Sequence, residues 1–340
     1  MKKLFTTLIS LLFTVVVLTG CQNTSGNSGD TSESDKKEKP QATAVAEFEY
    51  RIVEDEVFIS RFIGDTKNVV VPSEIEGLPV TKIIDFAFSQ NGNILSVTLP
   101  ETAVAVENLA FANCACLTEV KLPDGLTRIG QSAFENCEKL TTVVLPESLE
   151  SIGAKAFSNC KSLKKINIPK NLNTWRGEAF SYSGLEQVEF AEGLEKIGDS
   201  AFAGTKLKKV VMPKSLKEIG LQTFANCSEL ESIKLNDGLV TIGDSAFGGK
   251  SKLKDIVIPA SVKNINELAF GYCSNLKAVK FEGDAPEKYK YEAQWEIIGG
   301  SGNGQTDTSY VGDVNYTVYY HKDAEGFTSG EWCGYPTEIW

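Results

Sequence analysis

A phenylalanine recurs along the chain at a nearly constant interval, and this repeat limits the possible folds more than any other feature. Eight of nine such residues follow alanine and one follows threonine, with steps of 23 residues except for two of 22. They are Phe88, Phe111, Phe134, Phe157, Phe180, Phe202, Phe224, Phe247 and Phe270. Internal repeats of about 20 to 29 residues are typical of a solenoid, whose units bury their apolar side chains by stacking on one another. The repeat therefore predicts a stack of coils.

One unit, residues 126–149, reads LTRIGQSAFENCEKLTTVVLPESL and contains two patterns. Its Leu-x-x-Val-x-Leu-Pro portion alternates as a short strand does, and the proline ends the strand because it lacks a donor for the ladder. Its Ile-Gly-x-x-Ala-Phe portion does not alternate, which favours one tight helical turn with glycine at its entry. We therefore expect one short strand and one short helical turn in each coil.

The pattern IGxxAFxxCxxLxxVxLPxxL resembles the leucine-rich repeats of the BspA type, found in surface proteins of bacteria, and it covers residues 82–281. Residues 48–83 are similar to the entry segment of such proteins, with a hairpin and an initial strand that ends at Pro72. The resemblance implies an α/β leucine-rich repeat solenoid, a right-handed superhelix of short parallel strands and short helical turns. It also implies about nine coils of 22–23 residues, an N-terminal hairpin cap and a C-terminal β-rich cap.

The N-terminus has a basic start, a largely apolar run and the sequence Leu18-Thr19-Gly20-Cys21. This resembles the lipobox of bacterial lipoproteins, in which cleavage precedes the cysteine and the thiol is acylated. The alternatives are an ordinary signal peptide or a single membrane anchor, for which the apolar run is short. We expect an extracytoplasmic, surface-exposed protein that is held on the cell membrane by the lipid on Cys21 alone.

Composition divides the chain further. The expected parts are a signal peptide (1–20), a lipidated cysteine with a disordered tether (21–43), an N-terminal cap (44–81), the solenoid (82–281) and an acidic, aromatic C-terminal cap (282–340). The last part holds Trp295, Trp332 and Trp340, and we expect its rings to cover the open end of the solenoid. A binding site made by these rings is the alternative. The Gly-rich piece at 297–309 reads as a loop.

Little in the chain suggests catalysis. Its one histidine, His321, has no nucleophile motif beside it, and Cys114 and Cys116 form a lone Cys-x-Cys that is too weak a signal for zinc. The net charge of -11 becomes -13 without Lys2 and Lys3 of the leader, and such an acidic chain repels nucleic acid. We expect no enzyme activity, no metal, no cofactor and no nucleic-acid partner.

Residues 243–251, GDSAFGGKS, look at first like a phosphate-binding loop. That motif requires a glycine where this chain has Asp244, and it also requires a strand before it and a long helix after it. Gly243 and Phe247 instead occupy ordinary positions of the repeat. We therefore expect no nucleotide to bind there.

Five cysteines occupy one position of the repeat: Cys114, Cys137, Cys160, Cys227 and Cys273. Stacked side chains in parallel register point the same way, which suits a disulfide poorly. The favoured interpretation is a column of buried thiols that act as small apolar groups. Disulfide pairing between adjacent coils stays open as the alternative.

The candidate binding site is the outward side of the predicted strands, taken as the concave face. Its central positions include Lys121, Val144, Asn167, Glu189, Val211, Lys234 and Val257. The two outward rows contain no aromatic residue between 96 and 280, which weakens the case for a glycan ligand. Exposed valines within a mildly positive stripe fit a protein partner, whereas an ordinary solvated sheet is the alternative.

The resemblance implies macromolecular binding, with adhesion to host matrix or cell-surface proteins as the leading hypothesis. An envelope scaffold that binds components of its own cell is the second hypothesis, and an enzyme is a remote third. Fold alone does not choose among them, because function resides in particular sites.

Overall fold

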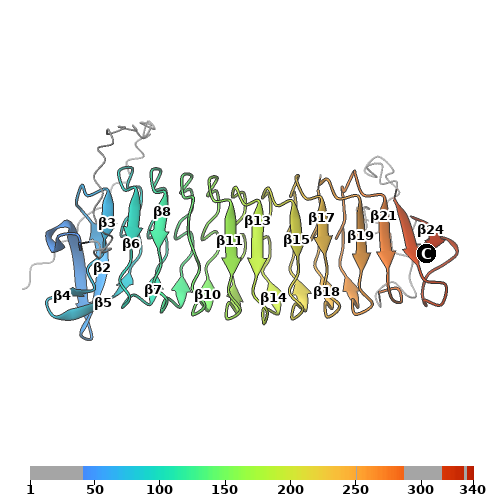
Figure 1. Cartoon of the computed structure of the whole chain (residues 1–340), viewed down its shortest axis with the longest axis horizontal. Coiled ribbons are helices and arrows are strands. Elements are labelled where there is room, and N and C mark those ends of the chain that lie inside the picture. The colour runs from blue at the N-terminus through green and yellow to red at the C-terminus, as the bar shows by residue number, and fades with distance from the viewer. Residues whose placement is uncertain (1–40, 250, 287–315, 333–334) are drawn as a thin grey trace, which may run out of the picture. The chain divides into compact units, whose positions relative to one another are not determined.

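The computed structural model describes residues 41–249, 251–286, 316–332 and 335–340, which belong to one compact unit, Glu38–Trp340. The coils of this unit lie side by side in chain order (Figure 1). The predicted leader, Cys21, the tether up to residue 40, Trp295 and the loop at 297–309 lie outside the described residues. Within the described part of the chain, no helix has the length and apolar character needed to cross a bilayer.

Two rows of short strands run along the unit. The first strand row consists of β3 (Asn68–Val70), β6 (Ser96–Thr98), β8 (Glu119–Lys121), β11 (Lys165–Ile168), β13 (Gln187–Phe190), β15 (Lys209–Val211), β17 (Ser232–Lys234), β19 (Asp255–Ile258) and β21 (Ala278–Phe281). The second strand row consists of β2 (Glu56–Phe62), β5 (Leu78–Ile83), β7 (Ala105–Val106), β9 (Arg128–Ile129), β10 (Ser151–Ile152), β12 (Thr174–Trp175), β14 (Lys196–Ile197), β16 (Glu218–Ile219), β18 (Thr241–Ile242) and β20 (Asn264–Ile265). Most coils thus contribute one short strand to each row.

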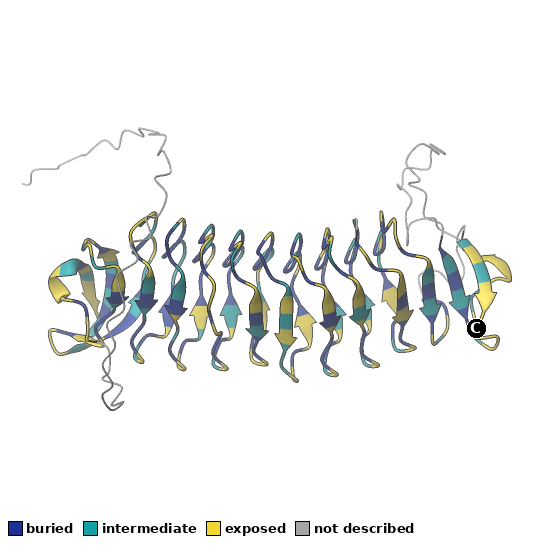
Figure 2. Ribbon diagram, turned by 45° about the horizontal axis from the view of Figure 1, so that its top comes forward, coloured by how far each residue is buried: buried dark blue, intermediate teal, exposed yellow. Residues whose placement is uncertain are grey.

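The strands pair in parallel between equivalent positions of successive coils. In the first strand row Val97 pairs with Val120, and in the second Ile129 pairs with Ile152. Equivalent side chains therefore stack in columns. Buried and exposed segments alternate along the ribbon in Figure 2. This arrangement confirms the predicted solenoid.

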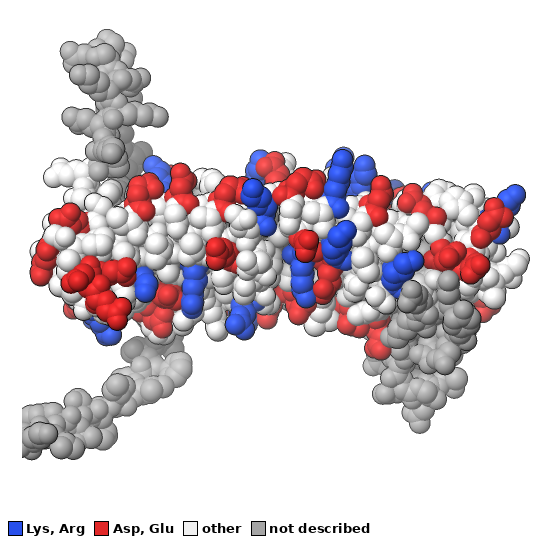
Figure 3. Space-filling model, turned by 90° about the horizontal axis from the view of Figure 1, so that it is seen from below, with Lys and Arg blue, Asp and Glu red and all other residues white. Residues whose placement is uncertain are grey.

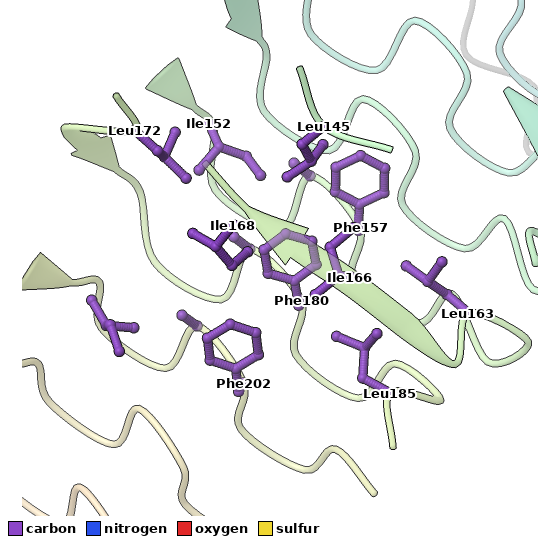
Figure 4. Close-up of a cluster of buried hydrophobic side chains, with 14 of the residues drawn as sticks. Leu145, Ile152, Phe157, Leu163, Ile166, Ile168, Leu172, Phe180, Leu185 and Phe202 are labelled. Carbon is purple, nitrogen blue, oxygen red and sulfur yellow. The ribbon is translucent and has the colours of Figure 1, made fainter. Parts of the chain in front are cut away.

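The repeating phenylalanines form a continuous column in the core. Neighbouring rings from Phe62 to Phe270 have centroids 4.7 to 5.8 Å apart and planes 2 to 17° from parallel. Phe157, Phe180 and Phe202 stack in this way beside a cluster of buried Leu and Ile side chains (Figure 4). Each fully buried ring contributes about 1.5 to 3 kcal/mol before entropy is subtracted.

The predicted helical turn is wrong. The only helix in the described residues is a single short 3-10 turn, η1 (Val45–Glu47). In the unit quoted above, the N–H groups of Ser132, Phe134 and Asn136 donate to carbonyls of the next coil, at 2.8, 2.8 and 2.9 Å. Ser132 and Asn136 have positive φ, 53 and 60°. Alternate amides thus leave the coil instead of bonding within it, so the segment forms a second strand followed by tight turns.

The predicted number of coils is too low: the stack has about 11 turns, whereas the sequence indicated nine. The extra turns come from the two caps. β2 pairs in parallel with β5, and the ring of Phe62 stacks on Phe88 at 5.3 Å, so the entry segment already follows the coil geometry. At the other end β22 (Thr317–Tyr320) pairs in parallel with β21. Neither segment carries the Ala-Phe pair that marks the repeat.

The N-terminal cap is the predicted hairpin. β1 (Phe48–Val53) pairs antiparallel with β2 through a turn at Glu54 and Asp55, whose φ values of 50 and 62° suit a two-residue hairpin turn. A second small hairpin joins β4 (Glu74–Ile75) to β5.

Strands and aromatic rings form the C-terminal cap, as predicted. β22 pairs with β24 (Tyr335–Ile339), and β24 pairs antiparallel with β23 (Gly330–Trp332). The rings of Phe327 and Trp332 lie 5.1 and 5.8 Å from that of Phe281, at the end of the last repeat. The cap therefore buries apolar surface that the last coil would otherwise expose.

The repeat cysteines are buried and free, which confirms the thiol-column interpretation. In each case the thiol donates to the carbonyl of the phenylalanine 25 or 26 residues earlier, for example Cys137 Sγ to Phe111 O at 3.1 Å. The five are Cys114, Cys137, Cys160, Cys227 and Cys273. Burial is the largest cause that raises the pKa of Cys227 to about 11 and that of Cys273 to about 12.

Trp175 replaces the usual isoleucine of the second strand row, and the structure shows how the core admits it. Its ring meets Phe180 and Phe202 edge-on, with centroids 6.3 and 6.2 Å away. A Cβ at Gly198 in the next coil would lie 2.5 Å from the Cβ of Trp175. The equivalent glycines Gly153 and Gly243 are as closely approached by the preceding coil, so Gly198 is an ordinary repeat glycine and Trp175 is a packing variant within the core.

Candidate binding face

The first strand row has an outward side on which equivalent positions align between coils. Strand registers place Thr98 beside Lys121, Asn167 beside Glu189, and Val211 beside Lys234. The preceding outward positions align in the same way, as Ser96 does with Glu119. The sequence-predicted site residues thus share one face.

Most of these side chains are open to solvent. Lys121, Glu189 and Lys234 are exposed, and Val144 and Val211 are exposed to 65 and 63%. Val257, at 38%, is more shielded. An outward row that includes such open valines has apolar area for a partner to cover.

Asn167 differs from the other candidates because it is half-buried and already bonded. Its Nδ2 donates to the carbonyl of Leu145 at 2.8 Å, and its Oδ1 accepts from the Leu145 N–H at 3.1 Å. The segment around Leu145 forms no extended strand, only one bridge at Thr142. The Asn167 amide therefore replaces missing ladder hydrogen bonds, so it serves the fold here rather than a partner.

The first strand row is interrupted at three places within the described residues. One is the coil of Val144, and the others fall between β13 and β15 and between β17 and β19, which no ladder joins. An exposed valine flanks each interruption: Val144, Val211 and Val257. Each valine is thus next to backbone that the sheet leaves unpaired.

Charges on this face partly neutralise one another. Lys165 pairs with Glu189 at 2.8 Å and Lys121 with Glu119 at 3.8 Å. Such exposed pairs contribute about 0 to 1 kcal/mol, so a partner can replace them at little cost. Basic and acidic side chains are likewise interspersed over the side of the molecule shown in Figure 3. No single charge dominates that side.

In the structure, the outward face continues into the C-terminal cap, and the outward positions read from the repeat did not include this part. Lys280 of β21 pairs with Tyr319 of β22, which pairs with Glu338 of β24. Residues 282–316 separate Tyr319 from the last repeat, so the 23-residue period does not reach it. The apolar alternation of Tyr316, Val318 and Tyr320 was the available signal. The outward rows between 96 and 280 contain no aromatic residue, and the cap adds Tyr319 beyond them.

A groove of about 300 Å³ opens at the interruption between β17 and β19. Its polar rim includes Lys234, Asp237, Asp255 and Glu282, and Val257 lines it as well. The equivalent amide one coil earlier, Met212 N–H, donates to Lys234 O at 3.0 Å. Leu235 N–H has no such backbone partner among the described residues. The groove thus presents apolar, charged and backbone polar groups together.

The remaining candidate groups form no catalytic arrangement in the part of the chain that the structure describes. His321 is exposed and stacks on the Trp340 ring at 5.1 Å. Residues 243–249 follow β18 as turns, and Gly243 N–H donates to Ile219 O of the preceding coil. Among the same described residues no group of three or more His, Cys, Asp and Glu side chains is arranged to hold a metal ion.

Comparisons with known proteins agree with this architecture. A family model described as BspA type leucine-rich repeat region, in six copies, matches residues 81–207 and 195–291. No curated protein matches the chain.

Two solved structures resemble the chain over most of its length. A leucine-rich repeat protein from Bacteroides ovatus is 26% identical with a TM-score of 0.66, covering 87% of this chain and 76% of its own. A leucine-rich repeat protein from T. pallidum is 28% identical with a TM-score of 0.50, covering 63% and 91%.

Proposed function

The chain belongs to the BspA-type leucine-rich repeat family, and from that membership we propose that it is a lipid-anchored cell-surface protein that binds another protein through the outward side of its first strand row. Leucine-rich repeat proteins are commonly protein-binding. The finer proposal is adhesion to a host matrix or cell-surface protein. Acylated Cys21 would hold the protein at the membrane while the solenoid stays in solution.

One observation carries the proposal. Val144 and Val211 expose 65 and 63% of their surface on the outward side of the first strand row, where the strand register places Val211 beside Lys234. Burial of apolar surface stabilises a complex by about 25 cal/mol per Å², and a rigid surface loses little conformational entropy when it binds. Lys165 and Glu189 form an exposed ion pair on the same face, and a partner's charged groups could replace either member.

The test compares two sets of valine-to-glutamate variants of the full-length protein in mild detergent. The first set changes Val144, Val211 and Val257. The matched control changes Val104 and Val240, which are exposed to 40 and 36% and precede strands of the second row. Each form is incubated with immobilised host matrix proteins, with host cells and with an extract of its own envelope.

We expect saturable binding to host proteins that the first set abolishes and the control set retains. Capture of only the cell's own envelope proteins would overturn adhesion in favour of a scaffold. Equal loss in both sets, or no loss in either, would contradict the assignment of binding to the first strand row.

A further inference from the structure

The last two strands of the first row, β19 and β21, continue into the cap strands β22 and β24 as one sheet, and its outward side differs from the rest of the face. β19, β21, β22 and β24 pair in that order. Registers align Val257, Lys280, Tyr319 and Glu338 across it. We call this outward side, with the adjoining groove between β17 and β19, the C-terminal corner.

Acidic side chains without ion-pair partners surround the groove. Asp237, Asp255 and Glu282 are exposed, and within the described residues none of them forms an ion pair. Lys234 and Lys280 oppose them, and Glu338 adds a fourth acid, so the corner has a net charge of -2. The groove therefore favours a cationic ligand.

An exposed aromatic ring lies at the other side of the corner. Trp340 is 44% exposed, and its Nε1 donates to the carbonyl of Phe281 at 3.2 Å, which holds the indole over β21 and β22. The ammonium of Lys280 lies 5.4 Å from the centre of this ring. The protein's own cation thus already occupies a cation–π position that a ligand could take.

We propose that the C-terminal corner binds an arginine side chain from an extended segment of a protein partner. The guanidinium would enter beside Trp340, displace the Lys280 ammonium and pair with the carboxylate of Glu282, which follows Phe281. Asp255, which the register places beside Ala278, would attract the guanidinium from farther away. Val257 and the unpaired Leu235 N–H would contact the aliphatic stem and the backbone of that segment. This inference rests on the proposed function, because it names the chemistry of the partner at one part of the same face.

Arginine fits this combination better than lysine. A planar guanidinium stacks on an aromatic face and offers a fork of N–H donors to carboxylates, whereas an ammonium is a compact and strongly hydrated charge. Lys280 already supplies an ammonium, so a second ammonium would gain little. The corner should therefore distinguish the two cations.

The probe is the acetylated and amidated peptide Ser-Arg-Gly-Arg-Ser, which has no aromatic residue. Its affinity for the full-length protein is measured by calorimetry and by tryptophan fluorescence, with versions that carry citrulline or lysine in place of arginine. We expect the citrulline version to lose binding, because it keeps the shape and lacks the charge. We expect the lysine version to bind more weakly than the arginine version. Equal binding of the arginine and citrulline versions would overturn the proposal.

Variants separate this site from the rest of the face. Asp255→Asn with Glu282→Gln, or Trp340→Ala, should weaken binding of the arginine peptide about tenfold, because each change removes a charge-assisted or cation–π contact. Lys280→Met should strengthen binding, because it removes the competing cation. The matched controls are Glu147→Gln and Tyr182→Ala, which change an exposed acid and an exposed aromatic residue elsewhere and should have no effect. Unchanged binding in the Asp255, Glu282 and Trp340 variants, or weaker binding in Lys280→Met, would contradict the assignment.

The two proposals fail in different ways. If a host protein binds through Val144 and Val211 while the arginine peptide does not bind, the corner assignment is wrong and the proposed function stands. If the peptide binds as described while no host or envelope protein is captured, the corner assignment stands and the proposed function is wrong.

Discussion

The side-chain amide of Asn167 forms two hydrogen bonds with the backbone of Leu145 in the preceding coil, one at each polar group of that residue. In a regular parallel ladder a backbone carbonyl would accept the Leu145 N–H. The side chain of Asn167 thus joins two coils where the strand is interrupted.

Asn167→Ala should therefore destabilise the protein. Without the Asn167 amide, the N–H and C=O groups of Leu145 lose their hydrogen-bond partners. Each of these groups that water cannot reach costs about 1 to 3 kcal/mol of stability. Urea denaturation measures the change. Asn264→Ala is the control, since that side chain is exposed in the second strand row and makes one 3.5 Å contact with Thr241. Equal effects of the two substitutions would contradict the role given to Asn167.

The phenylalanine column predicts a large difference between two phenylalanine substitutions. Phe157 is fully buried between Phe134 and Phe180, so Phe157→Ala should lower the free energy of unfolding by about 3 to 5 kcal/mol. Phe86 is 59% exposed and has a φ of 64°, a conformation that asparagine adopts more readily. Phe86→Asn should therefore leave stability within about 0.5 kcal/mol of the wild type or raise it. Calorimetric unfolding compares the two variants, and a large loss in Phe86→Asn would be unexpected.

Gly198 and Trp175 should be energetically coupled. A Cβ at residue 198 would lie 2.5 Å from the Cβ of Trp175, so Gly198→Ala should destabilise the protein by about 1 to 3 kcal/mol through overpacking. That clash involves the Cβ of Trp175, which isoleucine would keep, so Trp175→Gly, which removes this Cβ, should relieve part of the cost. A double-mutant cycle measures the coupling. Additive effects of the two substitutions would show that residues 198 and 175 are not energetically coupled.

The buried thiols predict a loss of stability in alkaline solution. Burial raises the pKa of Cys227 to about 11 and of Cys273 to about 12, against a usual value of 9.0. A folded-state pKa above the unfolded value means that the folded protein holds these protons more tightly. Their contribution is therefore complete below pH 9 and decreases as pH rises toward 11 to 12.

Urea midpoints measured across that pH range test this prediction, with the double variant Cys227→Ala and Cys273→Ala as the comparison. The wild type should lose more stability with pH than the variant does. A thiol reagent should also label these cysteines only after unfolding, because the reactive species is the thiolate. Rapid labelling of the folded protein would contradict the buried column.

Much of the fold could be predicted from local patterns. The 23-residue period and the alternation ending at proline predicted a stack with an inward column of Phe and Cys and an outward row that includes Val144. The helical turn was not predictable in the same way. The amide of Ser132 has an i→i+3 alternative within its own coil, and only the neighbouring coil shows that it donates to Ala154 instead.

For the candidate site, too, the period predicted the positions of the residues but not all of their contacts. Lys121, Val211 and Lys234 are exposed at the strand positions that the period indicated, and their role in binding stays a prediction. Asn167 has the correct register but faces the backbone of Leu145, because its amide can replace a missing ladder bond. The sequence contains no local mark for such an interruption.

The sequence by itself determined that this chain stacks its coils, because each unit repeats the same apolar positions and can bury them only against its neighbours. The tertiary structure alone decided that Tyr319 and Trp340 lie beside Lys280. The physical reason is distance along the chain. A long insertion separates β22 from β21, and only backbone pairing between the two strands returns the cap to the register of the repeat.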